Sequence, residues 1–394
     1  MPDLLLLALL VAAIAIGWWL GRRQRDPLEP RPRQQTSLSR DYFTGLNYLL
    51  NEQPDRAIET FVQVLEVDSD TIETHIALGN LFRSRGEADR AVRIHQNLLA
   101  RPALSVAQSD QVQLELSRDF LNLGVLDRAE RLLQQLIRDT RDEAMRRSAK
   151  RLLVDLFERE REWQQALDVA LPRLVQQEAD IRRAAAHWLC ELAHQHMNGA
   201  SPSLARKRLR QALATDASCI RANWLLATIE REAGNYKAEI RALRRIPEQD
   251  RSFTPIILEP LRNAYLKLED EEALEQCLRE LDEATPFTCA VIMLAQALER
   301  REGIAAAAEF AGTRLNANPS LRGIDYLMDL YLLDSDVAQH EHIVVVKQHI
   351  TKLLEARPRF RCHRCGFSGM QLHWQCPRCR SWGAIKPING LEGE

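Results

Sequence analysis

The chain has 394 residues and a nearly balanced charge, with 53 Lys and Arg against 55 Asp and Glu and a net charge of −2 at pH 7. This balance argues against a general nucleic-acid-binding protein, whose affinity depends on an excess of basic residues. Four of the eight cysteines cluster near the C-terminus. A cluster of thiols free to bind metal fits a reducing compartment, where disulfides are rare.

The N-terminal segment predicts a membrane anchor. Residues 4–20 carry no charge, and a helix over them would be roughly 26 Å long, enough to cross a bilayer core with little tilt. Trp18 and Trp19 lie near its end and three arginines follow, which is typical of the cytoplasmic interface. A cleaved signal peptide would carry positive charge before the apolar run, where only Asp3 occurs. We therefore expect an uncleaved transmembrane anchor over residues 1–21, with the rest of the chain in the cytoplasm.

Two further segments follow the anchor. Residues 22–39 are rich in Pro, Arg and Gln, with little to bury, and indicate a flexible cytoplasmic tether. Residues 40–356 contain few strand signals and many Ala, Leu and Arg at helical spacing. This long segment predicts an all-α body.

A repeat of 34 residues runs through this body. Gly45 is followed 34 residues later by Gly79, and Ala57 by Ala91, which is the period of the tetratricopeptide repeat. A small residue in each helix allows the two helices of a hairpin to approach closely. Later units keep this small residue less regularly, at Ala129, Ala166, Ala205, Ala238 or Glu239, Ala273 and Ala307. We predict about eight or nine units in a tetratricopeptide-repeat superhelix, an α-solenoid whose extended surface suits binding.

Cysteines and histidines within the repeats predict packing and no second metal site. Cys190, Cys219, Cys277 and Cys289 fall in helical apolar patterns, where a cysteine acts as a small buried hydrophobe. His187, Cys190 and His194 share one helix face and could in principle hold a metal ion. A histidine that lines a repeat groove is the interpretation we favour.

The C-terminal segment carries the pattern with the most specific chemistry. Cys362-His-Arg-Cys365-Gly is followed after ten residues by Cys376-Pro-Arg-Cys379, and two such pairs can offer one metal ion four thiolates in a tetrahedron. Gly366 follows the second cysteine, where a knuckle turn commonly needs a positive φ. A closed site of four thiolates accepts iron or zinc and leaves no position open for a substrate. We predict a rubredoxin-like or zinc-ribbon module over residues 357–386 that binds one metal ion.

The same module is basic. Between Arg357 and Lys386 there are six arginines, one lysine and no acidic residue, with four aromatic residues interleaved. Zinc knuckles of this composition can bind single-stranded nucleic acid. We expect instead that the aromatic side chains pack the small module and that the arginines pair with acidic helices of the repeats. The third alternative is that this surface binds an anionic protein or an anionic lipid.

Motifs of catalysis are missing from the sequence. It contains no Gly-x4-Gly-Lys-Ser/Thr loop, no Gly-x-Ser-x-Gly turn and no His-Glu-x-x-His pair. We therefore expect a protein without enzymatic activity.

The order of these parts resembles the lipopolysaccharide assembly protein B family. The resemblance rests on the Cys362-x-x-Cys365-Gly and Cys376-Pro-x-Cys379 pairs, on the repeat body, and on a Leu-rich anchor that ends in Trp-Trp-Leu-Gly-Arg-Arg. It covers essentially the whole chain, with residues 387–394 as a short tail. It implies a single-pass protein of the Gram-negative inner membrane whose metal ligands are the four cysteines.

The resemblance also implies partners. Members of the family act as adaptors that bring the deacetylase of the committed step of lipid A synthesis to a membrane-bound AAA+ protease. A second inner-membrane protein opposes this regulation. From the residues alone, a scaffold that gathers lipopolysaccharide enzymes and a rubredoxin-like electron carrier remain alternatives.

Overall fold

The computed structural model describes residues 72–390, apart from positions 103, 200, 285 and 335–339, together with scattered residues between 11 and 60. The tether predicted at residues 22–39 and most of the predicted anchor lie outside the described residues. Within the part that is described, no helix combines the length and the apolar character needed to cross a membrane.

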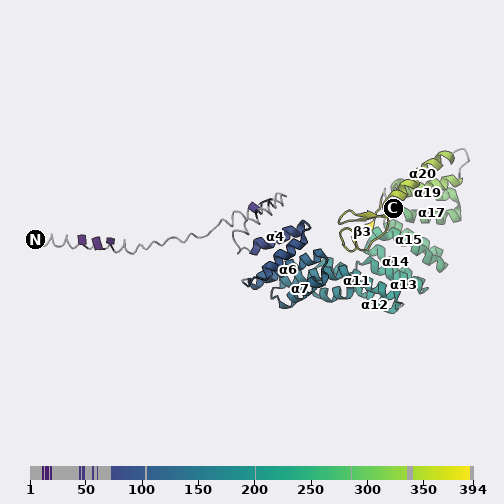
Figure 1. The fold of residues 1–394 in the computed structure, drawn as a ribbon. Coiled ribbons are helices and arrows are strands. Elements are labelled where there is room, and N and C mark those ends of the chain that lie inside the picture. Colours follow the sequence, from purple (N-terminus) through teal and green to yellow (C-terminus); the bar gives the residue numbers. More distant parts are fainter. Residues whose placement is uncertain are drawn as a thin grey trace. The chain divides into compact units, whose positions relative to one another are not determined.

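The chain divides into two compact units, residues 1–146 and residues 147–394. The described helices of the first unit are α4 (Ile72–Ser84), α5 (Ala88–Leu99), α6 (Val106–Leu123) and α7 (Leu126–Asp139) (Figure 1). Helix α8 (Glu143–Glu160) contains the boundary between the two units.

The repeat pattern determines how the helices of the first unit turn and pack. Gly86 and Gly124 follow α4 and α6 with φ angles of 83° and 74°, in the left-handed region that a glycine adopts without strain. Ala91 and Ala129, at the predicted small positions, are completely buried. The tight helix pairs expected from the sequence are therefore confirmed here.

A buried charged network links α4, α5 and α6 in this unit. The His95 Nδ1 atom lies 2.5 Å from Asp119 Oδ2, and both side chains are fully buried. Arg83 donates to Asp119 Oδ1 at 2.7 Å and to Glu115 Oε2 at 2.6 Å. Because each charge has a partner, the network fixes the position of the His95 ring against α4.

Gly79→Ala is expected to destabilise the protein by about 1–3 kcal/mol, because it forces extra volume into this packed core. A Cβ atom at Gly79 would lie 2.4 Å from His95 Nε2, and the ring is held by Asp119. The matched control is Gly312→Ala, also within a helix, where a Cβ atom would meet nothing within 4 Å. In thermal unfolding, the melting temperature should fall for Gly79→Ala and should not fall for Gly312→Ala. Equal melting temperatures of the two variants would contradict the packing argument.

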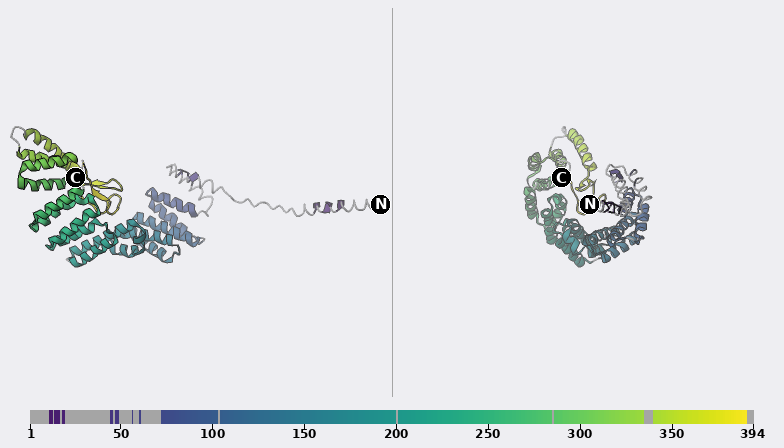
Figure 2. Two further views of the ribbon diagram at one scale, coloured as in Figure 1. Left: turned by 180° about the vertical axis from the view of Figure 1, so that it is seen from behind. Right: turned by 90° about the vertical axis from the view of Figure 1, so that its left-hand side faces the viewer.

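The second unit continues the helical pairs and ends in a small sheet. Consecutive helices pack as neighbours along this unit (Figures 1 and 2). Its elements after α8 are α9 (Trp163–Ala170), α10 (Arg173–Gln177), α11 (Ala179–Asn198), α12 (Pro202–Thr215), α13 (Ile220–Glu232), α14 (Tyr236–Gln249), the 3₁₀ turn η1 (Arg251–Phe253), α15 (Thr254–Lys267), α16 (Glu271–Ala284), α17 (Thr288–Glu302), α18 (Ile304–Ala317), α19 (Leu321–Asp334) and α20 (His340–Ala356).

The small positions are kept unevenly in this unit. Ala166, Ala205 and Ala307 are fully buried, as the period predicts. Between the two candidates at residues 238 and 239, the structure buries Glu239 and leaves Ala238 half-buried, and Ala273 is half-buried as well. Burial raises the pKa of the Glu239 carboxyl. The irregular middle units therefore fold as helices, although one of them places a carboxyl where an alanine is expected.

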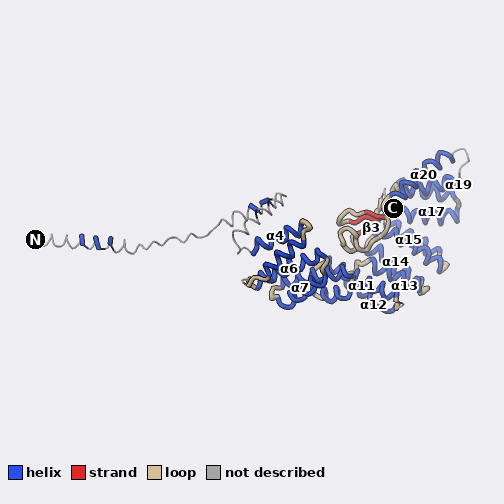
Figure 3. Tube along the Cα trace, viewed as in Figure 1, coloured by secondary structure: helices blue, strands red, loops and turns tan. Residues whose placement is uncertain are grey.

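The C-terminal module is a three-stranded antiparallel sheet with two turns that carry the four clustered cysteines. Strand β1 (Phe360–Cys362) pairs with both β2 (Ser368–Gly369) and β3 (Ile385–Pro387), so the strand order is β2-β1-β3. Figure 3 shows these strands in red. Its own apolar cluster is small and consists mainly of cysteine side chains and Ile385. The strands lie on the inner side of the curve that the helices of the second unit make (Figures 1 and 2).

Candidate metal centre

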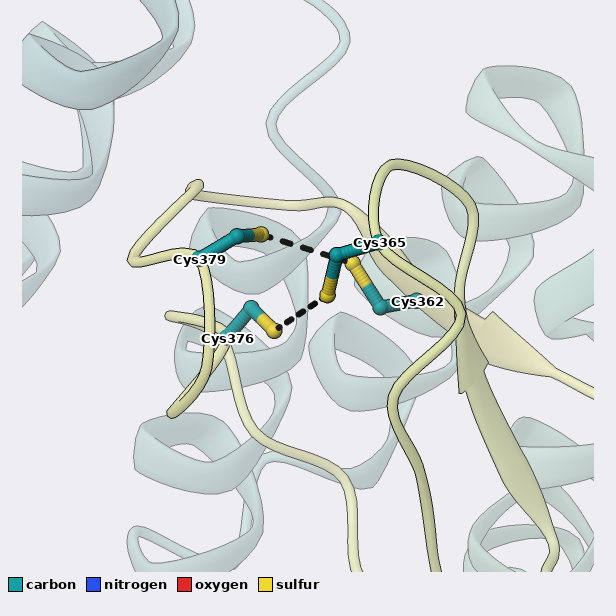
Figure 4. A group of neighbouring side chains, drawn as sticks. All are labelled: Cys362, Cys365, Cys376 and Cys379. Atoms are coloured by element: carbon teal, nitrogen blue, oxygen red, sulfur yellow. Dashed lines mark hydrogen bonds between the residues drawn. The ribbon is translucent and has the colours of Figure 1, made fainter. Parts of the chain in front are cut away.

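The four cysteines of the C-terminal module meet at one point. Cys362 ends β1 and Cys365 lies in the turn that follows, whereas Cys376 and Cys379 come from the second turn, and Figure 4 shows their sulfur atoms turned toward one another. All four sulfur atoms lie within 4.8 Å of one another. The Sγ atoms of Cys362 and Cys379 are 3.8 Å apart, and those of Cys365 and Cys376 are 3.6 Å apart.

These separations fit a tetrahedral metal site. A metal ion with four bonds to sulfur of about 2.3 Å places the sulfur atoms about 3.8 Å apart along each edge of the tetrahedron. A disulfide would bring two sulfur atoms to about 2.05 Å, and all four cysteines are free. The donor set and its dimensions therefore suit one tetrahedrally bound ion, iron or zinc.

The backbone of each turn is shaped to converge on this point. The Gly366 N–H donates to the Cys362 carbonyl at 2.9 Å with a φ of 74°, which confirms the positive φ predicted at this glycine. The second turn repeats the arrangement with a different residue, because the Arg380 N–H donates to the Cys376 carbonyl at 2.8 Å with a φ of 57°. Only the first turn has a glycine at this position, so the positive φ could be predicted from the sequence in the first turn alone.

The environment of the thiols is uneven. Burial raises the pKa of Cys376 to about 12. The Ser381 hydroxyl and backbone N–H favour the thiolate of Cys379 and lower the pKa of that thiol to about 6. A cysteine binds a metal ion through its thiolate, so an ion held by these four sulfurs would require each thiol to lose its proton, and the surroundings of Cys379 already favour that loss.

Trp382 joins the module to the helices of the second unit. Its indole is buried, stacks on the ring of His187 at a centroid distance of 5.1 Å, and meets Trp163 edge-on at 6.0 Å. Its Nε1–H donates to Glu158 Oε1, which also accepts a 2.7 Å hydrogen bond from Trp188 Nε1. One carboxylate of α8 thus connects an indole of the array to an indole of the module.

A second aromatic contact lies beside the first. The Trp374 ring stacks on Phe253 with a centroid distance of 6.3 Å and lies 6.2 Å from His187. A Cβ atom at Gly383 would lie 3.1 Å from His187 Nε2, and Gly383 has a φ of 61°. A glycine is needed here because the backbone approaches the histidine closely in a conformation that L side chains rarely adopt.

The pKa values of ionisable groups that lie against the module are shifted by this contact. Burial lowers the pKa of His187 to about 3, with help from the positive charges of Arg221 and Arg183, so the ring is neutral. Burial also raises the pKa of Glu158, although the indole hydrogen bonds oppose this shift. At Asp250 burial works in the same direction, but Lys386 and Ser252 outweigh it and lower the pKa of the carboxyl.

The expectation that the arginines of the module pair with acidic helices is right for only one of the six, Arg380, although the lysine of the module also forms an ion pair. Lys386 binds Asp250 at 2.6 Å, and Arg380 lies 3.6 Å from Asp155. The remaining five arginines make no ion pair with any residue that the structure describes: Arg357, Arg359, Arg361, Arg364 and Arg378.

The candidate trio on α11 does not form a site. His187 packs beneath Trp382, Cys190 lies with its Sγ atom 3.8 Å from that of Cys219, and His194 is exposed. The sequence placed His187 in a groove correctly but did not show that the metal module fills that groove. The link between Glu158 and Trp382 was also missed, since the two residues are separated by 224 positions.

Comparison with known proteins agrees with both parts of the fold. The family model described as rubredoxin metal binding domain matches residues 360–387, and two tetratricopeptide repeat models match residues 74–106 and 190–252. Among solved structures, MamA of Desulfovibrio magneticus aligns with 14% identity over 47% of this chain and 98% of that chain, with a TM-score of 0.32, a similarity too low to support a conclusion.

Relatives that match along the whole chain carry one name. Lipopolysaccharide assembly protein B of Escherichia coli strain K12 is 37% identical over 395 residues, covering 100% of this chain and 100% of the relative. The protein of the same name from Haemophilus influenzae is 32% identical over 403 residues, again covering 100% of each. The chain therefore belongs to the lipopolysaccharide assembly protein B family.

Proposed function

We propose that this protein is a membrane-anchored adaptor without enzymatic activity that limits lipopolysaccharide synthesis. In this proposal it brings the deacetylase of the committed step of lipid A synthesis to a membrane-bound AAA+ protease, and a second inner-membrane protein opposes it. The observation that carries the proposal is the match, along the entire chain, to relatives named lipopolysaccharide assembly protein B. The tetratricopeptide helices support it, because repeat arrays of this kind offer extended surfaces for protein partners.

The proposal includes the membrane. Residues 1–21 would form a single anchor in the inner membrane, residues 22–39 a tether, and the repeats of residues 40–356 would face the cytoplasm. An anchor confines the repeats to the membrane surface on which the protease lies, which raises the effective concentration of each partner without any new contact. The apolar run of residues 4–20 and the arginines after it support this topology.

The metal centre has a structural role in this proposal. Cys362, Cys365, Cys376 and Cys379 would bind one ion, iron or zinc, and would thereby fold the module of residues 357–386. A closed set of four thiolates leaves no position for substrate, so the ion stabilises a surface instead of performing hydrolysis. The packing of Trp382 and Trp374 against the helices supports a role in holding the second unit together.

The test is the half-life of the lipid A deacetylase in cells depleted of this protein while the protease is present. We expect depletion to lengthen the half-life several-fold and the intact chain to restore it, whereas a chain lacking residues 1–20 should restore it poorly. In cells that lack the protease, depletion of this protein should not change the half-life of the deacetylase any further. A half-life that depletion leaves unchanged would overturn the adaptor proposal and favour a scaffold that gathers lipopolysaccharide enzymes.

Electron transfer is the second candidate, and the site itself is the observation that favours it. Cys365 and Cys379 are half-buried, so an iron ion held there would lie near the surface. Iron bound by four thiolates can exchange one electron. A reversible one-electron couple in protein purified without added metal would favour this function, and a zinc-loaded protein would exclude it.

A further inference from the structure

A groove lies between the C-terminal helices and the metal module. Its volume is about 720 Å³, within the range of sites that bind small molecules or short peptide segments. Helices α15, α17, α19 and α20 form one wall, and the start of β1 and the residues around the end of β3 form the other. The groove therefore exists only while the folded module lies in place.

The apolar side chains that line the groove, called its floor below, are partly open to solvent. On the helical side it includes Ile256, Ile292 and Met293, and on the side of the module Phe360 and Ile388. All five side chains are half-buried, so each keeps part of its apolar surface in water. A bulky apolar side chain of a partner would remove this surface from water at a gain of about 25 cal/mol per Å².

The rim of the groove carries more positive than negative charge. Four arginines line it against three acidic residues, Glu259, Asp325 and Glu355. Glu259 already accepts from Arg262 at 2.6 Å, and Asp325 accepts from the Thr351 hydroxyl at 3.0 Å.

Two rim arginines are left without an acidic partner. Within the described part of the chain, neither Arg357 nor Arg359 forms an ion pair. They flank Pro358 in the connection between α20 and β1.

The backbone beneath these two arginines is fixed. The Arg359 N–H donates to the Gly369 carbonyl at 3.0 Å, and the Arg359 carbonyl accepts from the Ile388 N–H at 2.9 Å. The Arg357 N–H is bound to the Leu354 carbonyl at the end of α20. Because the end of α20 holds the backbone at Arg357 and the sheet of the module holds it at Arg359, a ligand would not have to order this segment, and ordering a segment on binding costs affinity.

We propose that this groove binds a short acidic segment of a partner protein, with one bulky apolar side chain on the floor and Asp or Glu side chains against Arg357 and Arg359. The floor favours a peptide over the other anionic partners. A membrane surface is too flat to cover half-buried side chains that line a groove, and single-stranded nucleic acid requires several exposed aromatic rings for stacking. This inference concerns the chemistry that the surface recognises and does not depend on whether the partner is degraded.

The test starts from a library of random heptapeptides displayed on phage and selected against the immobilised full chain in detergent. We expect the selected sequences to combine Asp or Glu with Leu, Ile or Phe. Synthetic, fluorescently labelled versions should bind the double variant Arg357→Glu/Arg359→Glu about tenfold or more weakly by anisotropy, since both rim charges are reversed. Ile256→Ala should weaken the same peptides by removing part of the floor.

The matched control is Arg361→Glu/Arg364→Glu, which makes the same change in net charge on the same module at residues that do not line the groove. Peptide binding to this control should stay close to that of the parent chain. Metal content and melting temperature show whether each variant is folded, and if the double glutamate variant is not, Arg357→Gln/Arg359→Gln takes its place.

Three outcomes would overturn the proposal. The first is a library that yields no acidic and apolar sequences. The second is an equal loss of binding in the groove variant and the control, which would indicate attraction by net charge alone. The third is vesicles of phosphatidylglycerol that bind through Arg357 and Arg359 when no peptide is selected, which would assign the surface to lipid.

Discussion

Replacing Cys376 by Ser is expected to abolish metal binding and unfold the C-terminal module while the repeats remain helical. Cys376 is fully buried, and its sulfur lies 3.6 Å from that of Cys365 within the quartet. The module has three short strands and a very small apolar cluster, so we expect its fold to depend on a bound ion. Metal binding to small units of this kind supplies about 10–16 kcal/mol of apparent free energy, far more than such a cluster provides.

The loss should extend beyond the module. Without the folded sheet, Trp382 and Trp374 leave His187 and Phe253, and an aromatic surface of the second unit becomes exposed to water. We therefore expect a lower melting temperature of the helices as well as rapid proteolysis after Ala356. In cells, this variant should fail to shorten the half-life of the deacetylase.

Cys289→Ser is the matched control, because Cys289 is a half-buried cysteine on α17 that belongs to no metal site within the described residues. Elemental analysis should find about one metal ion per chain in this control and almost none in Cys376→Ser. A Cys376→Ser protein that keeps its metal, its module and its regulation would show that the quartet is not the centre of the fold.

Much of the architecture could be predicted because it depends on local spacing. Ala91, Ala129, Ala166, Ala205 and Ala307 are fully buried, as a repeat with one small residue per unit predicts, whereas Ala273 is only half-buried and a glutamate, Glu239, takes the buried place beside Ala238. The cysteine quartet was predictable for a similar reason, since two residues between cysteines allow both sulfurs of a pair to approach one point. In both cases neighbours in the sequence determine the geometry.

The way the module is held could not be predicted, because it depends on residues far apart in the chain. Nothing near Glu158 in the sequence indicates that its carboxylate accepts from Trp382, 224 positions away. The basic residues show the same limit, since Lys386 and Arg380 face acidic helices and Arg357 and Arg359 face the groove. The amino-acid composition does not distinguish the basic residues that form ion pairs from those that line the groove. Only the packing of the module against the helices distinguishes them.

Trp382→Ala should separate the attachment of the module from its folding. Trp382 is not a metal ligand and does not belong to the module's own apolar cluster, so the variant should still bind its ion. It loses the stacking on His187, the contact with Trp163 and the hydrogen bond to Glu158. Removal of a buried tryptophan side chain lowers the free energy of unfolding by about 3–5 kcal/mol. Here we expect most of that loss to weaken the attachment of the module to the helices.

Met370→Ala is the control for this variant, because Met370 is an exposed apolar residue of the same module and should change the stability by less than about 0.5 kcal/mol. Thermal unfolding, metal content and limited proteolysis are measured on both proteins. We expect Trp382→Ala to keep its metal, to melt earlier, and to become sensitive to protease between α20 and β1. Met370→Ala should behave as the parent chain does.

The hydrogen bond to Glu158 can be isolated by a double-mutant cycle of Trp382→Phe and Glu158→Met, since methionine has about the length of glutamate but no oxygen that accepts from the indole. Phenylalanine keeps an aromatic ring on His187 but has no N–H donor, and we expect a coupling energy of about 1–3 kcal/mol because the donor belongs to a buried indole. A coupling near zero would assign the attachment to aromatic packing alone. If Trp382→Ala instead loses its metal, the indole is part of what folds the module, and attachment and folding are a single event.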